Sequence, residues 1–225
     1  MTTTTTRIRL GALSLALAGV MFILYPAVRP WRDESTAVSA QAAMSSGAWV
    51  ASHLFAMIGF ILVPLGLLAL WGLLSATRAE RVALVAAVAS WIGAGLTLPY
   101  YGAEDFGLYA VAVNGDRADL LAIVDGFRFD PVAVTLFAGG LLALAASGVL
   151  AAIGVWRSAI LPRSAGLVFA AGYVLFLPQF FTPAPVRIAH GVLLGIGLAW
   201  LSVAMWRGTD SAPNHRRPGA ARVGA

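Results

Sequence analysis

Three polar side chains able to carry acid–base or metal chemistry occur near the ends of apolar segments. His53 lies about five residues inside one such segment, and His190 lies at a similar distance inside another. Glu104 follows a third apolar segment, just after a proline and two tyrosines. At a rise of 1.5 Å per helical residue, both histidines would lie about 7 Å below the same membrane boundary. The matched depth predicts that the two imidazoles and the carboxylate share one outward-facing site.

Imidazole and carboxylate groups in one layer favour three kinds of chemistry. They could act as acid and base toward a lipophilic substrate, or His53, His190 and Glu104 could bind a divalent metal. The two histidines could also ligate a haem iron from separate helices. Alternatively, the same groups form a proton-coupled binding point in a transporter, a lipid-binding protein or an accessory subunit without enzymatic activity. The alternatives stay open because the sequence contains no HExxH motif or other recognisable catalytic signature.

Four further polar side chains are candidates for binding a substrate beside these groups, and they are Tyr100, Tyr101, Asp105 and Arg187. The arginine lies three residues before His190, on the same helix face, and could pair with Glu104 or hold an anionic head group. Each candidate also has a structural interpretation. The tyrosines suit the aromatic belt at headgroup level, the two acids suit the first turn of an interfacial helix, and the arginine suits the membrane interface. Each histidine alone could be a neutral imidazole bonded to a neighbouring helix.

The elements that must position these residues are membrane helices. Hydrophobic residues make up 60% of the 225 residues and charged residues only 11%, whereas roughly a quarter of an ordinary soluble domain is charged. Several segments contain about 18 or more apolar residues, enough to cross a hydrocarbon core. Because lipid offers no partner to unpaired backbone groups, we expect an all-α, polytopic integral membrane bundle. We therefore expect membrane lipid and a lipophilic small molecule as partners, and no nucleic acid.

About six transmembrane helices are predicted in one domain, 10–206. Their expected ranges are 10–28, 48–74, 82–103, 131–155, 164–181 and 186–206. A short polar N-terminus, 1–9, precedes the domain, and a basic tail without apolar periodicity, 207–225, follows it and is expected to be disordered. Near 116–128, apolar Leu120, Leu121, Val124 and Phe127 alternate with acidic residues. This pattern predicts an amphipathic helix on the outer surface, or a lid over the mouth of the bundle.

Charge distribution predicts the orientation of the bundle. Every cationic side chain is an arginine, and ten of the fifteen lie on the side that carries both termini, together with only two acids. The positive-inside rule therefore predicts cytoplasmic termini in a plasma (inner) membrane, with the segments 29–47, 104–130 and 182–186 facing outward. The absence of lysine, together with abundant alanine and glycine, is typical of a GC-rich bacterial genome. The absence of cysteine excludes disulfides and thiolate chemistry.

Overall fold

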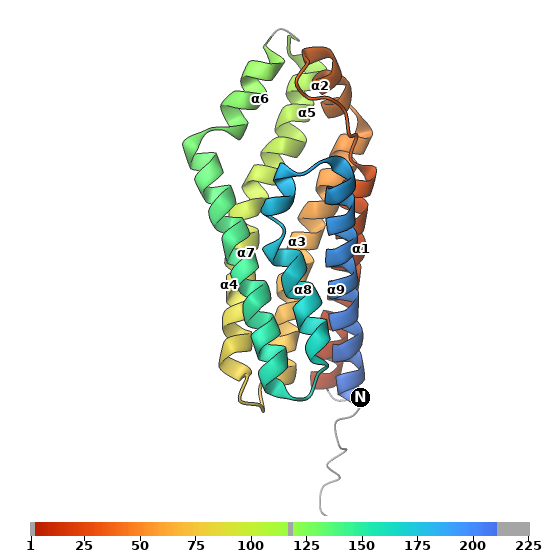
Figure 1. Cartoon of the computed structure of the whole chain (residues 1–225), viewed down its shortest axis with the longest axis vertical. Coiled ribbons are helices and arrows are strands. Elements are labelled where there is room, and N and C mark those ends of the chain that lie inside the picture. The colour runs from red at the N-terminus through yellow and green to blue at the C-terminus, as the bar shows by residue number, and fades with distance from the viewer. Residues whose placement is uncertain (1–2, 117–118, 211–225) are drawn as a thin grey trace, which may run out of the picture.

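The computed structural model describes residues 3–116 and 119–210, and within these ranges its regular structure is entirely helical. Six long or medium helices run along one axis (Figure 1): α1 (Thr3–Val28), α3 (Gly47–Leu74), α4 (Glu80–Gly102), α7 (Pro131–Ser158), α8 (Arg163–Val174) and α9 (Ala184–Asp210). The short helices α2 (Ala37–Met44), α5 (Leu108–Asn114) and α6 (Leu120–Arg128) lie together at one end, and we call them the cap. The π-helical segment η1 (Ala103–Gly107) and the 3-10 turn η2 (Pro178–Phe181) complete the elements. The predicted all-α bundle is confirmed.

The six axial helices form a closed ring in which each packs mainly against two neighbours, in the order α1, α3, α4, α7, α8 and α9. Large side chains fill the centre of the ring, and the fully buried ones include Phe22, Phe60, Phe169, Tyr173 and Phe176. Each helix contributes a stripe of buried aromatic, leucine and small side chains to this core, and its other side chains face outward. The large apolar side chains exposed on the outside of the bundle are those expected to face lipid.

Both ends of the described chain lie at the end of the bundle opposite the cap (Figure 1). Arg9 Nε donates a hydrogen bond to Thr209 Oγ1 at 3.2 Å, and the Arg9 guanidinium lies 4.8 Å from the ring centre of Trp206. We call this the terminal end. Helix α1 already begins at Thr3, inside the predicted polar segment 1–9, and α9 continues to Asp210. The rest of the predicted tail, 211–225, lies outside the described residues.

Within the described ranges, five helical segments are long and apolar enough to cross a membrane. The predicted span 164–181 differs, because α8 contains only 12 residues and ends at Val174. Pro178 explains the early end: a proline in a helix removes one backbone donor and its ring clashes with the carbonyl four residues earlier, here that of Val174. Turns and η2 carry the chain over the remaining distance before α9. The bundle thus combines five candidate spans with one shorter helix.

The third predicted span, 82–103, continues much further than expected. Helix α4, η1 and α5 form one helical segment of 35 residues, Glu80–Asn114, about 52 Å at 1.5 Å per residue and longer than a hydrocarbon core of about 30 Å. Our expectation that 104–114 is part of an outer loop was therefore wrong. The helix continues through Glu104 and Asp105 because both acids lie in η1, where the turns are π-helical and wider than those of an α-helix. It ends at Asn114, and Gly115 is its C-cap residue.

The cap has its own small hydrophobic core. Its buried members are Ala40, Ala43, Met44, Trp49, Leu108, Ala112, Leu120 and Val124. The amphipathic helix predicted near 116–128 is present as α6, although it begins at Leu120, and 117–118 lie outside the described residues. As predicted, Leu120 and Val124 are buried, and Leu121 and Phe127 pack against the same core. The amphipathic pattern therefore identified the element that covers this end of the bundle.

Glycine allows α9 to approach α8 closely. A Cβ atom added at Gly197 would lie 2.7 Å from Phe169 N and 2.8 Å from Phe169 Cα, both backbone atoms of α8. We expect Gly197→Ala to lower the free energy of unfolding by about 1 kcal/mol, because the added methyl group forces the two helices apart. Thermal unfolding in detergent measures this effect. The matched control is Gly95→Ala, where the added Cβ meets no atom within 4 Å; equal losses in both variants would contradict the prediction.

Candidate polar site beneath the cap

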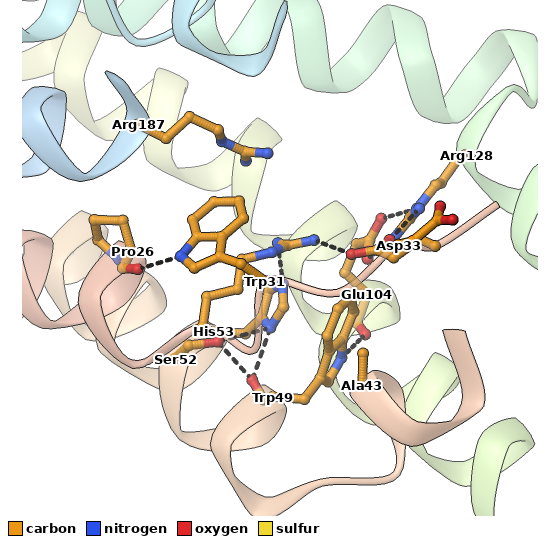
Figure 2. Close-up of polar contacts among 12 residues, drawn as sticks. Pro26, Trp31, Asp33, Ala43, Trp49, Ser52, His53, Glu104, Arg128 and Arg187 are labelled. Atoms are coloured by element: carbon orange, nitrogen blue, oxygen red, sulfur yellow. Dashed lines mark hydrogen bonds and ion pairs between the residues drawn. The ribbon is translucent and has the colours of Figure 1, made fainter. Parts of the chain in front are cut away.

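Four side chains of alternating charge form a continuous network at the cap end, and we call Arg29, Glu34, Arg128 and Glu104 the charge network (Figure 2). Arg128, the last residue of α6, donates from Nε to Glu104 Oε1 at 2.6 Å and from Nη2 to Glu104 Oε2 at 3.0 Å. Its Nη1 donates to Glu34 Oε2 at 2.8 Å, and Arg29 Nη2 donates to Glu34 Oε1 at 3.0 Å. Two positive and two negative groups leave the network without net charge. It ties α6 and the segment after α1 to η1.

His53 and Trp49 close this network into a ring. Arg29 Nη1 lies 3.3 Å from His53 Nε2, and His53 Nδ1 lies 2.8 Å from the carbonyl oxygen of Trp49. The Trp49 indole Nε1 donates to the carbonyl oxygen of Glu104 at 2.8 Å. A guanidinium group can only donate and a carbonyl can only accept, so these contacts place the His53 proton on Nδ1 and leave Nε2 as the acceptor. The network therefore holds His53 as a neutral imidazole.

Mutual attraction keeps the network groups outside the spans ionised. Burial alone would raise the pKa of Glu34, but the charges of Arg29 and Arg128 lower it below its ordinary value. Burial opposes the charge of Arg128 in the same way, whereas its hydrogen bonds and attraction to Glu104 and Glu34 raise its pKa. Each ion is therefore stabilised by its partners, in addition to the water that reaches the partly exposed side chains of Arg128 (21%) and Glu34 (22%). Loss of one partner would leave a poorly hydrated charge uncompensated.

His190 lies next to the network of His53, on the far side of Tyr25. His190 Nε2 lies 2.8 Å from the carbonyl oxygen of Gly172 and donates to it, and the imidazole meets the Phe176 ring edge to face. It also lines a cavity of about 10 Å³ together with Tyr25, a volume that suits about one water molecule. The Tyr25 ring lies 5.9 Å from the ring of His53. Of the three predicted site residues, the structure joins His53 and Glu104 in one network and places His190 beyond Tyr25.

The predicted substrate-binding residues have other contacts. Arg187 Nε donates to Gln179 Oε1 at 3.0 Å, and its guanidinium lies 4.9 Å from the ring centre of Trp31, whereas Glu104 pairs with Arg128. Tyr100 is half-buried and stacks on Phe137, with ring centres 4.1 Å apart.

Tyr101 is buried among the rings of Tyr25, His53 and Phe60. The aromatic-belt interpretation is therefore wrong for Tyr101, because its ring faces into the bundle.

Asp105 is the most unusual of the predicted residues. Its side chain is completely buried, and within the described part of the chain neither carboxyl oxygen has a hydrogen-bond partner. The interfacial first-turn interpretation is wrong for both acids, because η1 lies inside a continuous helix. One turn further along, Leu108 belongs to the cap core. The π-helical turn thus directs Glu104 to Arg128 and leaves Asp105 buried without a partner.

The donor groups do not fit the metal and haem alternatives. Among the described residues, no group of three or more His, Asp or Glu side chains is arranged to hold a metal ion. One ring nitrogen of His190 and both of His53 are already engaged, and the Glu104 carboxylate is held by the fork of Arg128. In the described part of the chain, the engaged donors therefore leave no ready-made set of metal or haem ligands.

Sequence reasoning missed four residues that build this site, namely Arg29, Glu34, Trp49 and Arg128. A signal was available for the arginines, since two adjacent acids at the end of an apolar run need cations, and Arg29 and Arg128 belong to the outward segments. No sequence signal distinguished these two from the other outward arginines. Trp49 lies near the start of a predicted span, and we interpreted it as part of the aromatic belt. That interpretation is wrong, because Trp49 is fully buried in the cap core.

Comparison of the chain with protein-family models, with curated proteins and with solved structures gives no match.

Proposed function

We propose that the chain is a multi-pass membrane protein whose cap end binds and releases a proton at Asp105, and that this step is coupled to movement of the cap. The observation that carries the proposal is the complete burial of a carboxyl group without a hydrogen-bond partner in the described structure. Ionisable groups within membrane segments are costly and usually functional. The finding of five helices able to cross a membrane supports the membrane setting.

A buried carboxylate must be compensated by a cation, by water or by a proton. The cations of the charge network are already engaged, since Arg128 neutralises Glu104 and Arg29 shares Glu34. The network is charge-balanced, so it offers no surplus positive charge to a second carboxylate at Asp105. A proton compensates the group without needing additional space, which is why we favour proton binding.

Release of that proton would affect the cap first. An anion at Asp105 requires water, and water can reach it only if the packing around η1 loosens. The cap core begins at Leu108, one helical turn away, and covers Trp49, whose indole holds the backbone of Glu104. Deprotonation is therefore expected to open the cap while the ring of axial helices stays closed. This behaviour suits a proton-coupled transporter or accessory subunit more than an enzyme.

Acid–base catalysis on a lipophilic substrate is the second candidate. It is favoured by the single network that holds His53 and Glu104 within the same layer. It requires Arg29 and Arg128 to release these groups, and the cavity beside His190, about 10 Å³, is far too small for such a substrate. Proton binding at Asp105 needs neither rearrangement, so the geometry supports it better.

Single cysteines can test the proposal, because the chain has none of its own. Ala43→Cys places a thiol in the buried cap core, and Val38→Cys places one at an exposed position of the same helix. Labelling by a water-soluble maleimide in lipid vesicles is measured over a range of pH. The Ala43 rate is divided by the Val38 rate, because thiolate formation itself increases with pH. We expect the ratio to rise several-fold toward alkaline pH as the cap opens.

In an Asp105→Asn background the ratio should stay constant, because the asparagine cannot ionise. Asp125→Asn is the matched control, since Asp125 is an exposed cap residue, and it should preserve the pH response. A response that persists in Asp105→Asn would contradict the proposal. A constant ratio in the Asp125 control as well would show that cap stability in general, and not ionisation of Asp105, governs the labelling.

A further inference from the structure

A basic cavity lies at the terminal end of the bundle, which is the end opposite the cap. Its volume is about 580 Å³, and its polar lining includes Arg78, Glu80, Arg81 and Arg157. Arg78 follows α3, Arg81 is in the first turn of α4, and Arg157 is in the last turn of α7. Three separate parts of the chain thus bring exposed guanidinium groups to one cavity.

These arginines have charge available for a ligand. Three arginines and one glutamate give the lining a formal charge of +2, and within the described part of the chain none of the three arginines forms an ion pair with a carboxylate. Arg78 is held in place by its Nε, which donates to the carbonyl oxygen of Arg157 at 2.9 Å. Helix α4 also begins here, and no side chain caps its N-terminus. Its dipole adds to the attraction for an anion.

The remaining lining is apolar and continues toward the middle of the bundle. The apolar part of the lining consists of Val82 and Val85 of α4 and Leu150 of α7. A second cavity of about 280 Å³, lined by Leu167 among others, shares Arg157 and extends along α7 and α8. Apolar surface therefore lies on both sides of Arg157.

We propose that this cavity binds an anionic phospholipid. The headgroup phosphate would accept hydrogen bonds from Arg78, Arg81 and Arg157, and an acyl chain would lie on Val85 and Leu150. Basic pockets between membrane helices are suited to anionic lipid head groups, and guanidinium forks match phosphate geometry. A soluble phosphate would use the arginines but leave the apolar surface uncovered. The combined chemistry therefore favours lipid, and the inference is independent of proton binding at Asp105.

Lipid binding to the detergent-purified protein provides the test. Dissociation constants for phosphatidylglycerol and phosphatidylcholine, which share acyl chains and differ in headgroup charge, are measured by native mass spectrometry. We expect the wild type to prefer phosphatidylglycerol. The double variant Arg81→Gln/Arg157→Gln should weaken phosphatidylglycerol binding roughly thirtyfold and phosphatidylcholine binding little. The variant Arg81→Lys/Arg157→Lys, which keeps both charges, should retain most of the preference.

Arg7→Gln/Arg163→Gln is the matched control, because both arginines lie near the terminal end and neither lines the cavity. It makes the same change in net charge and should leave the preference intact. Equal affinity of the wild type for both lipids would overturn the proposal, as would equal losses in the two glutamine variants. Saturating inorganic phosphate and glycerol phosphate form a separate arm. If either raises the melting temperature as much as phosphatidylglycerol does, the ligand is a soluble phosphate and the lipid assignment is wrong. If the glutamine variant does not fold, the wild-type lipid comparison and the lysine variant decide.

Discussion

Replacement of Arg128 by alanine is expected to lower the free energy of unfolding by about 3 kcal/mol, the low end of the loss typical when one partner is removed from a buried ion pair, because the Arg128 side chain is 21% exposed. Arg128 makes a two-bond fork with Glu104 and a third hydrogen bond with Glu34. Its removal leaves the Glu104 carboxylate, which is only 8% exposed as a residue, without its cation. It also detaches the end of α6 from η1. Thermal or denaturant unfolding in detergent measures the loss.

Two further variants separate the role of the ion pair from a general effect of losing an arginine. Arg32→Ala removes an exposed arginine from the segment that carries Glu34 and should change stability by less than about 0.5 kcal/mol. Adding Glu104→Gln to Arg128→Ala should recover part of the loss, because no buried carboxylate then remains unpaired. The interpretation fails if Arg128→Ala is no more destabilising than Arg32→Ala. It also fails if Glu104→Gln destabilises the Arg128→Ala variant as much as it destabilises the wild type.

The parts of this fold that depend on local pattern could be predicted from the sequence. Long apolar runs identified the five candidate spans, and the spacing of Leu120, Val124 and Phe127 identified the apolar face of α6. The matched depth of His53 and His190 predicted that both share a site with Glu104, and the structure joins His53 and Glu104 in one network of contacts. Depth does not determine which helices are neighbours, and His190 lies beyond Tyr25 for that reason.

The partners of these groups could not be predicted, because they come from segments distant in sequence. Glu34 and Arg128 are separated by 94 positions, and neither lies in an apolar run. The continuation of the helix through Glu104 and Asp105 was also hidden, since two adjacent acids after a proline are typical of a helix boundary. Tertiary contacts reverse that tendency here: Arg128 compensates one acid and Trp49 holds the backbone of the same turn.

Acidification is expected to release the segment after α1 through Glu34. The charges of Arg29 and Arg128 lower the pKa of Glu34 below its ordinary value of 4.5 despite burial, which acts in the opposite direction. A group whose pKa is depressed by folding stabilises the folded state above its ordinary pKa, and the contribution is lost as the pH falls through the depressed value. The contribution of Glu34 to stability should therefore be constant from neutral pH down to about 5 and fall below about 4.5.

Glu34→Gln isolates this contribution, because the amide keeps the shape of the side chain but cannot ionise. At neutral pH the variant should be less stable than the wild type by about 3 kcal/mol, since Glu34 accepts charge-assisted hydrogen bonds from two arginines. The two stability curves should converge in acid, where the wild-type carboxylate is protonated. Asp33→Asn is the control: hydrogen bonds from Ser35 lower the pKa of Asp33 too, but the carboxylate is fully exposed and contacts neither arginine. Its curve should follow that of the wild type closely, because local hydrogen bonds to an exposed carboxylate contribute little to the free energy of folding. Parallel curves for wild type and Glu34→Gln down to strong acid would show that Glu34 does not link the two arginines.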